Sequence, residues 1–408
     1  MRVTPVITGL GCVTCFGATV DAFATALIGG RTGVAPIARF DTTGLHSHRA
    51  ALVTGYDPSA FIPPLKLRRI DGIGRVALGA TRQALEDARL GSPSDREQAG
   101  LVLGSFTAGG QTTGEYLESL HQGGSAAAPA LLFANTVGNA AASLCGLEFG
   151  LRGPNTTISH KEASGLAALA FAADLVRLGR TQTVVAGGAD DLYERFFSVH
   201  DWFDVLSRDA SSPEGSRPFD ATRNGFVFGE GGFMCVVEDP VAASRRNARI
   251  YGEILGVGAS GSGEPLNHWP SSPAGLARTM RAALDDAGCA PGEIGAVYAS
   301  ANSTRQLDAV EAVAIGEVFQ RRVPVTSIKG AVGEFGAVGA AAALAAIACG
   351  ARRRIPPTAG FAAPDPACPV DVTSADRALE RPLILVNSFA SGGTLYSMLL
   401  RAETRGAP

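Results

Sequence analysis

The sequence predicts an α/β fold built from stacked layers of helices and sheets. Three observations support this: strand-like and helix-like segments alternate along the chain, the helical segments are rich in alanine, and there are 51 glycines. Small residues favour close packing of helices on sheets, and this alternation is typical of α/β layers. With 408 residues, 46% of them hydrophobic and 18% charged, the chain can bury large cores in two similar halves.

The first part of the chain alternates strands and helices around a loop-rich excursion at residues 31–66, which contains four prolines. We expect this excursion to lie over the fold. In chain order the pattern predicts a strand, a helix bounded by glycine, a buried strand, a short amphipathic helix and, after a Gly/Ala-rich segment, a longer helix: Val3–Thr14, Arg75–Leu90, Gly100–Thr107, Glu115–Leu120 and Phe133–Gly150.

Residues 154–188, PNTTISHKEASGLAALAFAADLVRLGRTQTVVAGG, form the central stretch of the chain. A β-like run turns sharply into an almost wholly apolar helix, expected over Ala163–Leu178 and ended by Gly179. A buried strand, Thr181–Ala186, follows. Such a strand–elbow–helix places one side chain at a helix N-terminus, which is a usual position for a nucleophile. The residue at that position is Glu162.

The second part of the chain begins near Ile250 and again alternates strands with helices. It predicts a strand, a helix, a strand, a helix, a strand, a small-residue helix and two closing strands: Tyr251–Ala259, Ser272–Ala287, Ile294–Ala301, Leu307–Phe319, Val323–Ile328, Gly336–Cys349, Leu383–Val386 and Thr394–Leu400. No linker is long enough to separate independent domains. We therefore divide the chain into two packed halves, residues 1–249 and 250–408.

Composition excludes several classes of function. The net charge of −3 and the absence of a basic tract argue against nucleic-acid binding. There is neither an apolar run long enough to span a bilayer nor a signal peptide, so we expect no membrane association and a cytoplasmic location. Cys12 and Cys15 form a C-x-x-C pair, but no second pair or histidine cluster completes a metal site. We interpret both cysteines as structural.

Two motifs carry a resemblance to a known family. Residues 153–165 read GPNTTISHKEASG and align with the pattern G-P-N-x-T-x-S-T-A-C-S-S-G on their first three and last two residues. Residues 216–231 read SRPFDATRNGFVFGEG, close to S-R-P-F-D-x-x-R-x-G-F-V-x-G-E-G. Over nearly its whole length the chain resembles the β-ketoacyl-acyl carrier protein synthases of the thiolase superfamily. The resemblance implies a thiolase fold, with two pseudo-repeated halves in a five-layer α-β-α-β-α arrangement. We interpret the second motif as a charge-paired turn.

The positions that carry the family's chemistry are replaced in this chain. Glu162 falls on the acyl-accepting cysteine of these synthases. The residues on the two catalytic histidines are Ser300, in YASANSTRQLDAVE, and Glu334, in KGAVGEFGAVG. A carboxylate accepts hydrogen bonds and repels a developing oxyanion, and Ser300 can donate only one weak hydrogen bond, so we expect no condensation by this chain alone.

Other family positions are partly retained. Glu311 and Lys329 match a supporting glutamate and lysine, which the resemblance implies form a charge pair beside the site. Ser391 replaces the phenylalanine that gates the acyl pocket. For Glu162 the sequence favours a structural role, in which the carboxylate accepts backbone N–H groups at its helix N-terminus and Lys161 and Lys329 compensate its charge.

The resemblance is closest to chain length factors, the catalytically silent partners of ketosynthases in bacterial type II polyketide synthases. It implies a heterodimer with an active ketosynthase, an acyl carrier protein that delivers the growing chain, and no cofactor or metal. Chain length factors usually carry glutamine at the position of Glu162, so this chain departs from their pattern. The G-E-F-G-A sequence at Glu334 favours partners from reducing polyene systems over aromatic ones.

Two rival functions follow from the same residues. Glu162 and Glu334 form a carboxylate pair that could serve acyl transfer or hydrolysis, because two carboxylates in one cleft raise the pKa of one of them. A decarboxylase that loads starter units is disfavoured, since such variants keep the histidines. A complete Cys-His-His ketosynthase encoded beside this chain would favour the silent subunit.

Tunnel and dimer residues are also implied by the resemblance. The tunnel wall is expected along Thr112–Leu120 and the helix near Phe133–Leu144, with bulky members Thr112, Tyr116, Leu120 and Phe133. The strand Thr181–Ala186, with Thr181, Thr183 and Val185 alternating along it, is expected to be an open edge that pairs across a two-fold axis.

Overall fold

A computed structural model describes residues 3–210, 212–320 and 323–403. The strands of the first half form one sheet with the order β5-β4-β6-β8-β1. In β1 and β8 every residue is buried, because both faces of the sheet are covered by helices. The bounds of these strands are Val6–Val13 for β1, Gly100–Gly104 for β4, Asn155–Ile158 for β5, Thr183–Asp190 for β6 and Gly231–Glu238 for β8.

The second half repeats this arrangement. Its strands run β11-β10-β15-β16-β9, so each half places its five strands in the order third, second, fourth, fifth, first, and β13 (Asp371–Val372) extends the second sheet. Val6 and Ile7 of β1 pair with Glu253 and Gly252 of β9, and this pairing joins the sheets of the two halves into one continuous sheet. The bounds are Gly252–Gly261 for β9, Ile294–Tyr298 for β10, Pro324–Thr326 for β11, Leu383–Phe389 for β15 and Thr394–Ala402 for β16.

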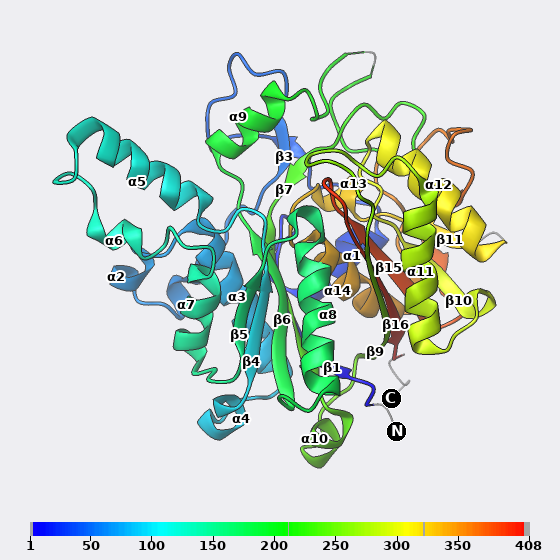
Figure 1. Cartoon of the computed structure of the whole chain (residues 1–408), viewed down its shortest axis with the longest axis horizontal. Helices are drawn as coiled ribbons and strands as arrows, with labels where there is room; N and C mark the ends of the chain where they lie inside the picture. The colour runs from blue at the N-terminus through cyan, green and yellow to red at the C-terminus, as the bar shows by residue number, and fades with distance from the viewer. Residues whose placement is uncertain (1–2, 211, 321–322, 404–408) are drawn as a thin grey trace.

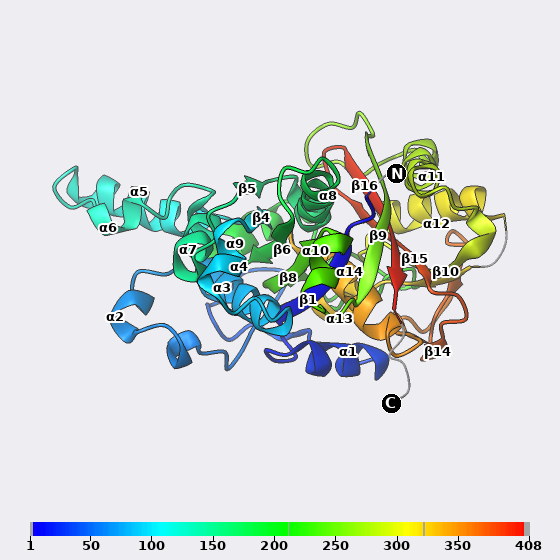
Figure 2. The same ribbon diagram turned by 90° about the horizontal axis from the view of Figure 1, so that it is seen from below.

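Helices fill three layers around the two sheets, as Figures 1 and 2 show. α3 and α7 cover the outer face of the first sheet, α8 and α14 lie between the sheets, and α11 and α12 cover the outer face of the second. The five-layer α-β-α-β-α thiolase fold predicted from the sequence is therefore confirmed. The bounds are Gly72–Asp87 for α3, Ala140–Phe149 for α7, Ser164–Arg177 for α8, Pro273–Ala287 for α11, Arg305–Phe319 for α12 and Val338–Gly350 for α14.

The middle layer explains the small residues of the sequence. All residues of α14 are buried, because this helix is enclosed by both sheets and by α8. A Cβ at Gly165 would lie 2.8 Å from the carbonyl oxygen of Ala337 and 2.9 Å from the amide nitrogen of Ala340. Only glycine allows the start of α8 to approach α14 this closely.

The shorter elements complete the chain. A small sheet of β2 (Ala35–Pro36), β3 (Arg49–Ala51) and β7 (Phe228–Gly229) holds the excursion at residues 31–66. The remaining helices and strands are α1 (Val20–Ile28), η1 (Pro58–Ala60), α2 (Pro64–Leu67), α4 (Pro93–Glu97), α5 (Gly110–Gly123), α6 (Ala130–Phe133), η2 (Lys161–Ala163), α9 (Glu194–Trp202), α10 (Pro240–Arg245), η3 (Pro291–Glu293), α13 (Lys329–Val332), β12 (Arg354–Ile355) and β14 (Arg377–Ala378). Within the described ranges, none of the helices is both long and apolar enough to cross a membrane.

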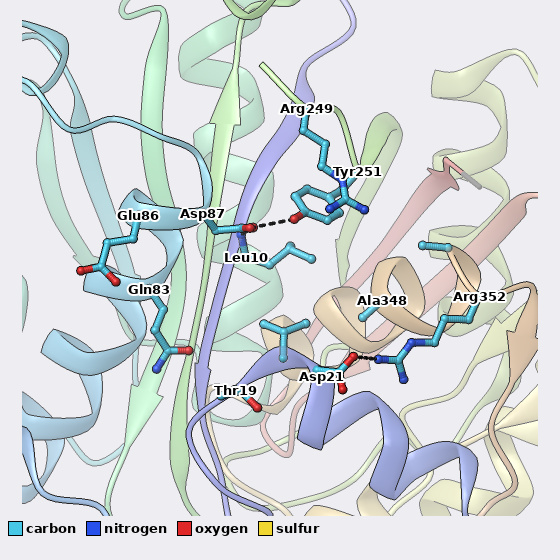
Figure 3. Close-up of a pocket in the computed structure, with 12 residues that line it drawn as sticks. Leu10, Thr19, Asp21, Gln83, Glu86, Asp87, Arg249, Tyr251, Ala348 and Arg352 are labelled. Atoms are coloured by element: carbon cyan, nitrogen blue, oxygen red, sulfur yellow. Dashed lines mark hydrogen bonds and ion pairs between the residues drawn. The ribbon is translucent and has the colours of Figure 1, made fainter. Parts of the chain in front are cut away.

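A polar joint connects the two halves beside a cavity of about 420 Å³ (Figure 3). Asp87 of α3 accepts hydrogen bonds from the amide of Leu10 at 2.9 Å and from the hydroxyl of Tyr251 at 2.7 Å. Asp21 and Arg352 form an ion pair on the opposite wall. The boundary proposed after residue 249 lies in this region, between α10 and β9.

Two predicted helices have different bounds in the structure. The short helix expected over Glu115–Leu120 is the longer α5, and α5 with α6 extends away from the body of the molecule (Figure 1). The single helix expected over Phe133–Gly150 is two helices, α6 and α7, separated by a turn that contains Gly138.

The predicted dimer edge is wrong. β6 lies inside the sheet, where Val185 pairs with Leu101 of β4 on one side and with Val236 of β8 on the other. Thr183 pairs with Glu238, and Thr181 lies before the strand, where its hydroxyl bonds the carbonyl oxygens of Gln98 and Thr183. Both edges of β6 are already used, so it cannot pair with a second subunit. The open edge of this sheet is β5, which among the strands that the structure describes pairs with β4 only.

Candidate functional site

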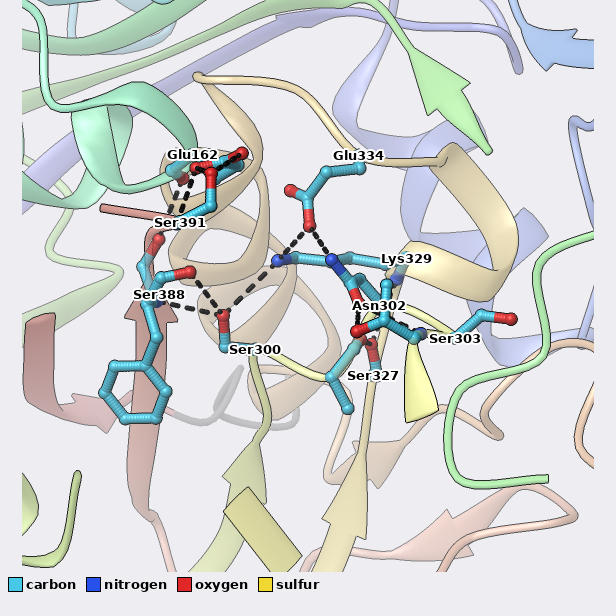
Figure 4. A network of polar contacts seen from close by, with 12 residues as sticks. Glu162, Ser300, Asn302, Ser303, Ser327, Lys329, Glu334, Ser388 and Ser391 are labelled. Atoms are coloured by element: carbon cyan, nitrogen blue, oxygen red, sulfur yellow. Dashed lines mark hydrogen bonds and ion pairs between the residues drawn. The ribbon is translucent and has the colours of Figure 1, made fainter. Parts of the chain in front are cut away.

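The elbow between β5 and α8 is a single 3₁₀ turn, η2, as the sequence predicted for a strand–turn–helix. The turn requires a left-handed backbone at Lys161, with φ of 50°. The Ser164 hydroxyl stabilises it by accepting from the amide of His160 at 2.9 Å and donating to the carbonyl of Lys161 at 2.6 Å. This geometry directs the Glu162 side chain toward the second half of the chain (Figure 4).

The carboxylate of Glu162 is held by Ser391, which comes from the loop between β15 and β16. The amide of Ser391 donates to Oε2 at 3.0 Å, and its hydroxyl donates to Oε1 at 2.9 Å. Glu162 is 5% exposed. The predicted helix-capping role of Glu162 is therefore wrong: no side-chain cap is formed at α8, and the backbone N–H that Glu162 accepts belongs to Ser391.

Lys161 also hydrogen-bonds the Ser391 hydroxyl that donates to Glu162. Its Nζ donates to Ser391 Oγ at 2.6 Å and to Asn267 Oδ1 at 2.7 Å, and it lies 5.5 Å from the ring centre of Phe106. Because Ser391 Oγ accepts from Lys161, its one proton is directed to Glu162. The lysine thus compensates the carboxylate through a hydroxyl and not by direct contact.

A second network lies beside the first (Figure 4). Lys329 Nζ donates to Glu334 Oε2 at 2.8 Å and to Ser300 Oγ at 3.3 Å, and Asn302 Nδ2 also donates to Glu334 Oε2 at 2.8 Å. Glu334 Oε1 is buried without a hydrogen-bond partner in the described part of the chain. Burial raises the pKa of Glu334; the positive charge of Lys329 opposes this increase, while the negative charge of Glu162 adds to it.

Glu311 does not form the charge pair predicted with Lys329. Its Oε1 accepts from the amide of Ser300 at 2.9 Å and from Nδ2 of Asn387 at 2.9 Å. The ion pair of Lys329 is with Glu334 instead, because Glu334 occupies the histidine position directly above the ammonium group. Burial raises the pKa of Glu311 to about 7. Glu311 thus positions the strand end that carries Ser300.

The hydroxyl of Ser300 is engaged inside the protein. It accepts from the amide of Phe389 at 2.9 Å and from Lys329, and its nearest acceptor is the carbonyl oxygen of Phe389 at 3.4 Å. Neither replaced histidine position therefore presents a free donor to a ligand at the elbow.

Comparison with known proteins agrees with this architecture. Residues 4–242 match the family described as Beta-ketoacyl synthase, N-terminal domain, and residues 251–362 match its C-terminal domain. This chain belongs to the beta-ketoacyl synthase family. The first match lies within residues 1–249 and the second within residues 250–408, while the division of the chain at residue 249 stays a prediction.

Members of this family with assigned names align over nearly the whole chain. The 3-oxoacyl-[acyl-carrier-protein] synthase 2 of Coxiella burnetii is 31% identical over 404 residues, covering 97% of each chain. A Streptomyces halstedii protein described as polyketide beta-ketoacyl synthase 1 is 34% identical over 401 residues, covering 95% of this chain and 94% of that one. The solved structure named the ishigamide ketosynthase/chain length factor matches with a TM-score of 0.92 at 29% identity, covering 100% of both chains.

The second family motif is structural, as the sequence predicted. Arg223 forms ion pairs with Asp365 and with Asp308, the latter at 3.7 Å. Asp220 accepts from the amides of Ala362 and Ala363, which ties this turn to the second half. These contacts of Asp220 and Arg223 hold the two halves of the ketosynthase fold together.

The four predicted tunnel residues separate into two places. Thr112 is buried and lines a broad cavity of about 800 Å³ beside α3. The rings of Tyr116 and Phe133 lie 5.7 Å apart on the projecting α5–α6 pair, where Phe133 is 61% and Leu120 36% exposed. Figure 1 shows that the α5–α6 pair, which carries these three residues, projects away from the body of the molecule. Their role as a tunnel wall stays a prediction.

Sequence reasoning missed two residues of the site. Asn302 lies two positions after Ser300 and could have been noted as a polar side chain within the same motif. Asn267 belongs to an irregular loop between β9 and α11, and nothing in the sequence places it beside Lys161. Only the tertiary structure brings that loop over the elbow.

Proposed function

We propose that this chain is a non-catalytic chain length factor. It pairs with an active ketosynthase and shapes the tunnel in which a polyketide chain is elongated on an acyl carrier protein. The observation that carries the proposal is the state of the elbow: a carboxylate, Glu162, stands where the family has its cysteine, and Ser391 holds both of its oxygens. A carboxylate held in this way does not replace the thiolate of a cysteine, so we expect no acyl transfer to Glu162.

The surrounding groups support the same conclusion. Decarboxylation of a malonyl unit requires donors directed at the thioester oxygen, and removal of one such donor costs about 10²–10³ in rate. Glu334 is an acceptor bound by Lys329, and the Ser300 hydroxyl is engaged by Phe389. Because all three chemical positions are changed together, we expect no condensation by this chain.

Two surfaces support pairing with another subunit. β5 has one unpaired edge, and unpaired edges are usually covered in stable proteins. The projecting α5–α6 region exposes a group of large apolar side chains, which marks an interaction surface: Leu117, Leu120, Leu131, Phe133 and Val137. A relative with this fold is named as a ketosynthase/chain length factor. We expect an obligate interface that buries more than roughly 2,000 Å².

A second candidate is an acyltransferase or hydrolase that uses Glu162 and Glu334 as an acid–base pair. One observation favours it, since the charge of Glu162 contributes to the raised pKa of Glu334. Glu162→Ala separates the two functions. The silent subunit should retain most activity of the reconstituted complex after this change, whereas complete loss with an intact fold would favour the carboxylate enzyme.

The test is co-expression with the ketosynthase subunit of the same gene cluster, followed by light scattering and mass analysis of the products. We expect one heterodimer that makes a defined chain length, and no product from either subunit alone. A monodisperse monomer that ignores the ketosynthase would overturn the proposal.

A further inference from the structure

A cavity of about 380 Å³ opens between α8 and the strands β9 and β16. Its walls include Thr157 and His160 from the β5–elbow segment, Phe171 and Asp174 from α8, and Tyr396 from β16. β5 and α8 lie along the same face of the molecule (Figures 1 and 2). The cavity therefore adjoins the open strand edge that is proposed to meet the ketosynthase.

The cavity contains two polar atoms without partners. Thr157 Oγ1 and His160 Nδ1 are both buried, and neither has a hydrogen-bond partner in the part of the chain that the structure describes. The imidazole is fixed by stacking on Tyr396, with ring centres 6.0 Å apart and an interplanar angle of 25°. Burial lowers the pKa of His160, which favours the neutral ring with an acceptor nitrogen. Buried polar groups are nearly always paired, so these two atoms are available to hydrogen-bond a group that enters the cavity.

The other walls of the cavity indicate which kind of side chain would fit in it. Aromatic rings, Phe171 and Tyr396 with His160, surround an apolar interior that also includes Val257 and Ala259. Asp174 adds a carboxylate that is 58% exposed. Arg177 lies 3.6 Å from Asp174, but it is shared with Asp286 at 3.5 Å, so the exposed carboxylate can bind a second cation. A side chain with an apolar stem and a cationic tip fits these walls. Its stem would pack against the aromatic rings, and its charged tip would bind the Asp174 carboxylate and the two unpaired acceptor atoms.

We infer that this cavity receives one basic side chain, lysine or arginine, from the partner ketosynthase. The inference rests on the proposed function, because it requires a partner at the β5 edge. The amides of Leu101 in β4 and of Ser105 just after it donate to the carbonyls of Pro154 and Ile158, so the alternate residues Asn155 and Thr157 direct their backbone groups outward. A strand paired there would run past Thr157 and bring the partner's side chains to the mouth of the cavity.

The experiment measures the dissociation constant of the heterodimer at low and high salt for two cavity variants. Asp174→Asn removes the charge with little change in shape, and Phe171→Ala removes a ring that is 43% exposed. We expect each to weaken binding roughly tenfold at low salt, and Asp174→Asn to reduce the salt dependence as well.

Matched controls lie outside the cavity. Leu178→Ala removes an exposed side chain, 72% exposed, at the end of α8, and Asp285→Asn removes an exposed acid from α11. Both control variants should bind the ketosynthase with a dissociation constant within about twofold of that of the wild type. Circular dichroism checks that each variant is folded.

Two results would overturn the inference and are distinguishable. If the wild type binds the ketosynthase and both cavity variants bind equally well, the cavity is not a recognition pocket, while the proposed function stands. If the wild type forms no heterodimer, the proposed function and this inference are both wrong.

Discussion

The buried ion pair between Lys329 and Glu334 gives the sharpest prediction. The two atoms lie 2.8 Å apart, and the side chains are only 5% and 1% exposed. Lys329→Met removes the cation and leaves the carboxylate buried. Loss of one partner of such a pair costs about 3–5 kcal/mol, because the remaining charge is neither solvated nor compensated.

A matched control is the surface pair between Arg152 and Glu97, whose atoms lie 3.1 Å apart with side chains 74% and 61% exposed. Arg152→Met should change the free energy of unfolding by no more than about 1 kcal/mol. Urea denaturation followed by circular dichroism, at one fixed protein concentration, measures both variants. The double variant Lys329→Met/Glu334→Leu should recover much of the loss, since it removes the uncompensated charge.

The loss of unfolding free energy caused by Lys329→Met should depend on pH. Burial raises the pKa of Glu334, and removal of Lys329 takes away the group that opposes this increase. A carboxyl with a raised pKa binds its proton more tightly in the folded state, so stability falls as pH rises from the usual carboxyl range through the raised value. Lys329→Met should therefore be closest to wild type near pH 5 and worst at alkaline pH. If Lys329→Met and Arg152→Met lost equal amounts of unfolding free energy at every pH, the assignment of a stabilising buried ion pair would be refuted.

Three further predictions concern function. Glu162→Cys should not decarboxylate malonyl-acyl carrier protein, because Ser300 and Glu334 still provide no oxyanion donor; appreciable carbon dioxide release by the purified variant would contradict the silent site. Tyr116→Ala or Phe133→Ala should lengthen the products of the reconstituted complex if that ring closes the tunnel, and unchanged product masses from both variants in a stable complex would refute the placement. Thr157→Pro removes an outward backbone N–H from β5 and should abolish heterodimer formation while the chain stays folded, as light scattering and circular dichroism would report; an unimpaired heterodimer would argue against pairing at this edge.

The sequence by itself determined the fold and the chemical identity of the site. The alternating strands and helices, the small-residue helix α14 and the elbow at Glu162 all follow from local pattern, because period and glycine placement are local properties. The replaced positions Glu162, Ser300 and Glu334 could also be located, since each lies within a motif of fixed spacing. The structure brings them to one place, as Figure 4 shows.

Only the tertiary structure decided which groups bond to one another. The family motifs suggest Glu311 as the partner of Lys329, but within the described residues the ion pair of Lys329 forms with Glu334. Glu162 has the position of a helix cap, yet it bonds to Ser391, which lies 229 residues away. Likewise, Thr183 and Val185 alternate like an edge strand, although β4 and β8 cover both sides of β6. Strand order and long-range hydrogen bonds depend on how distant segments pack, and no local pattern contains that information.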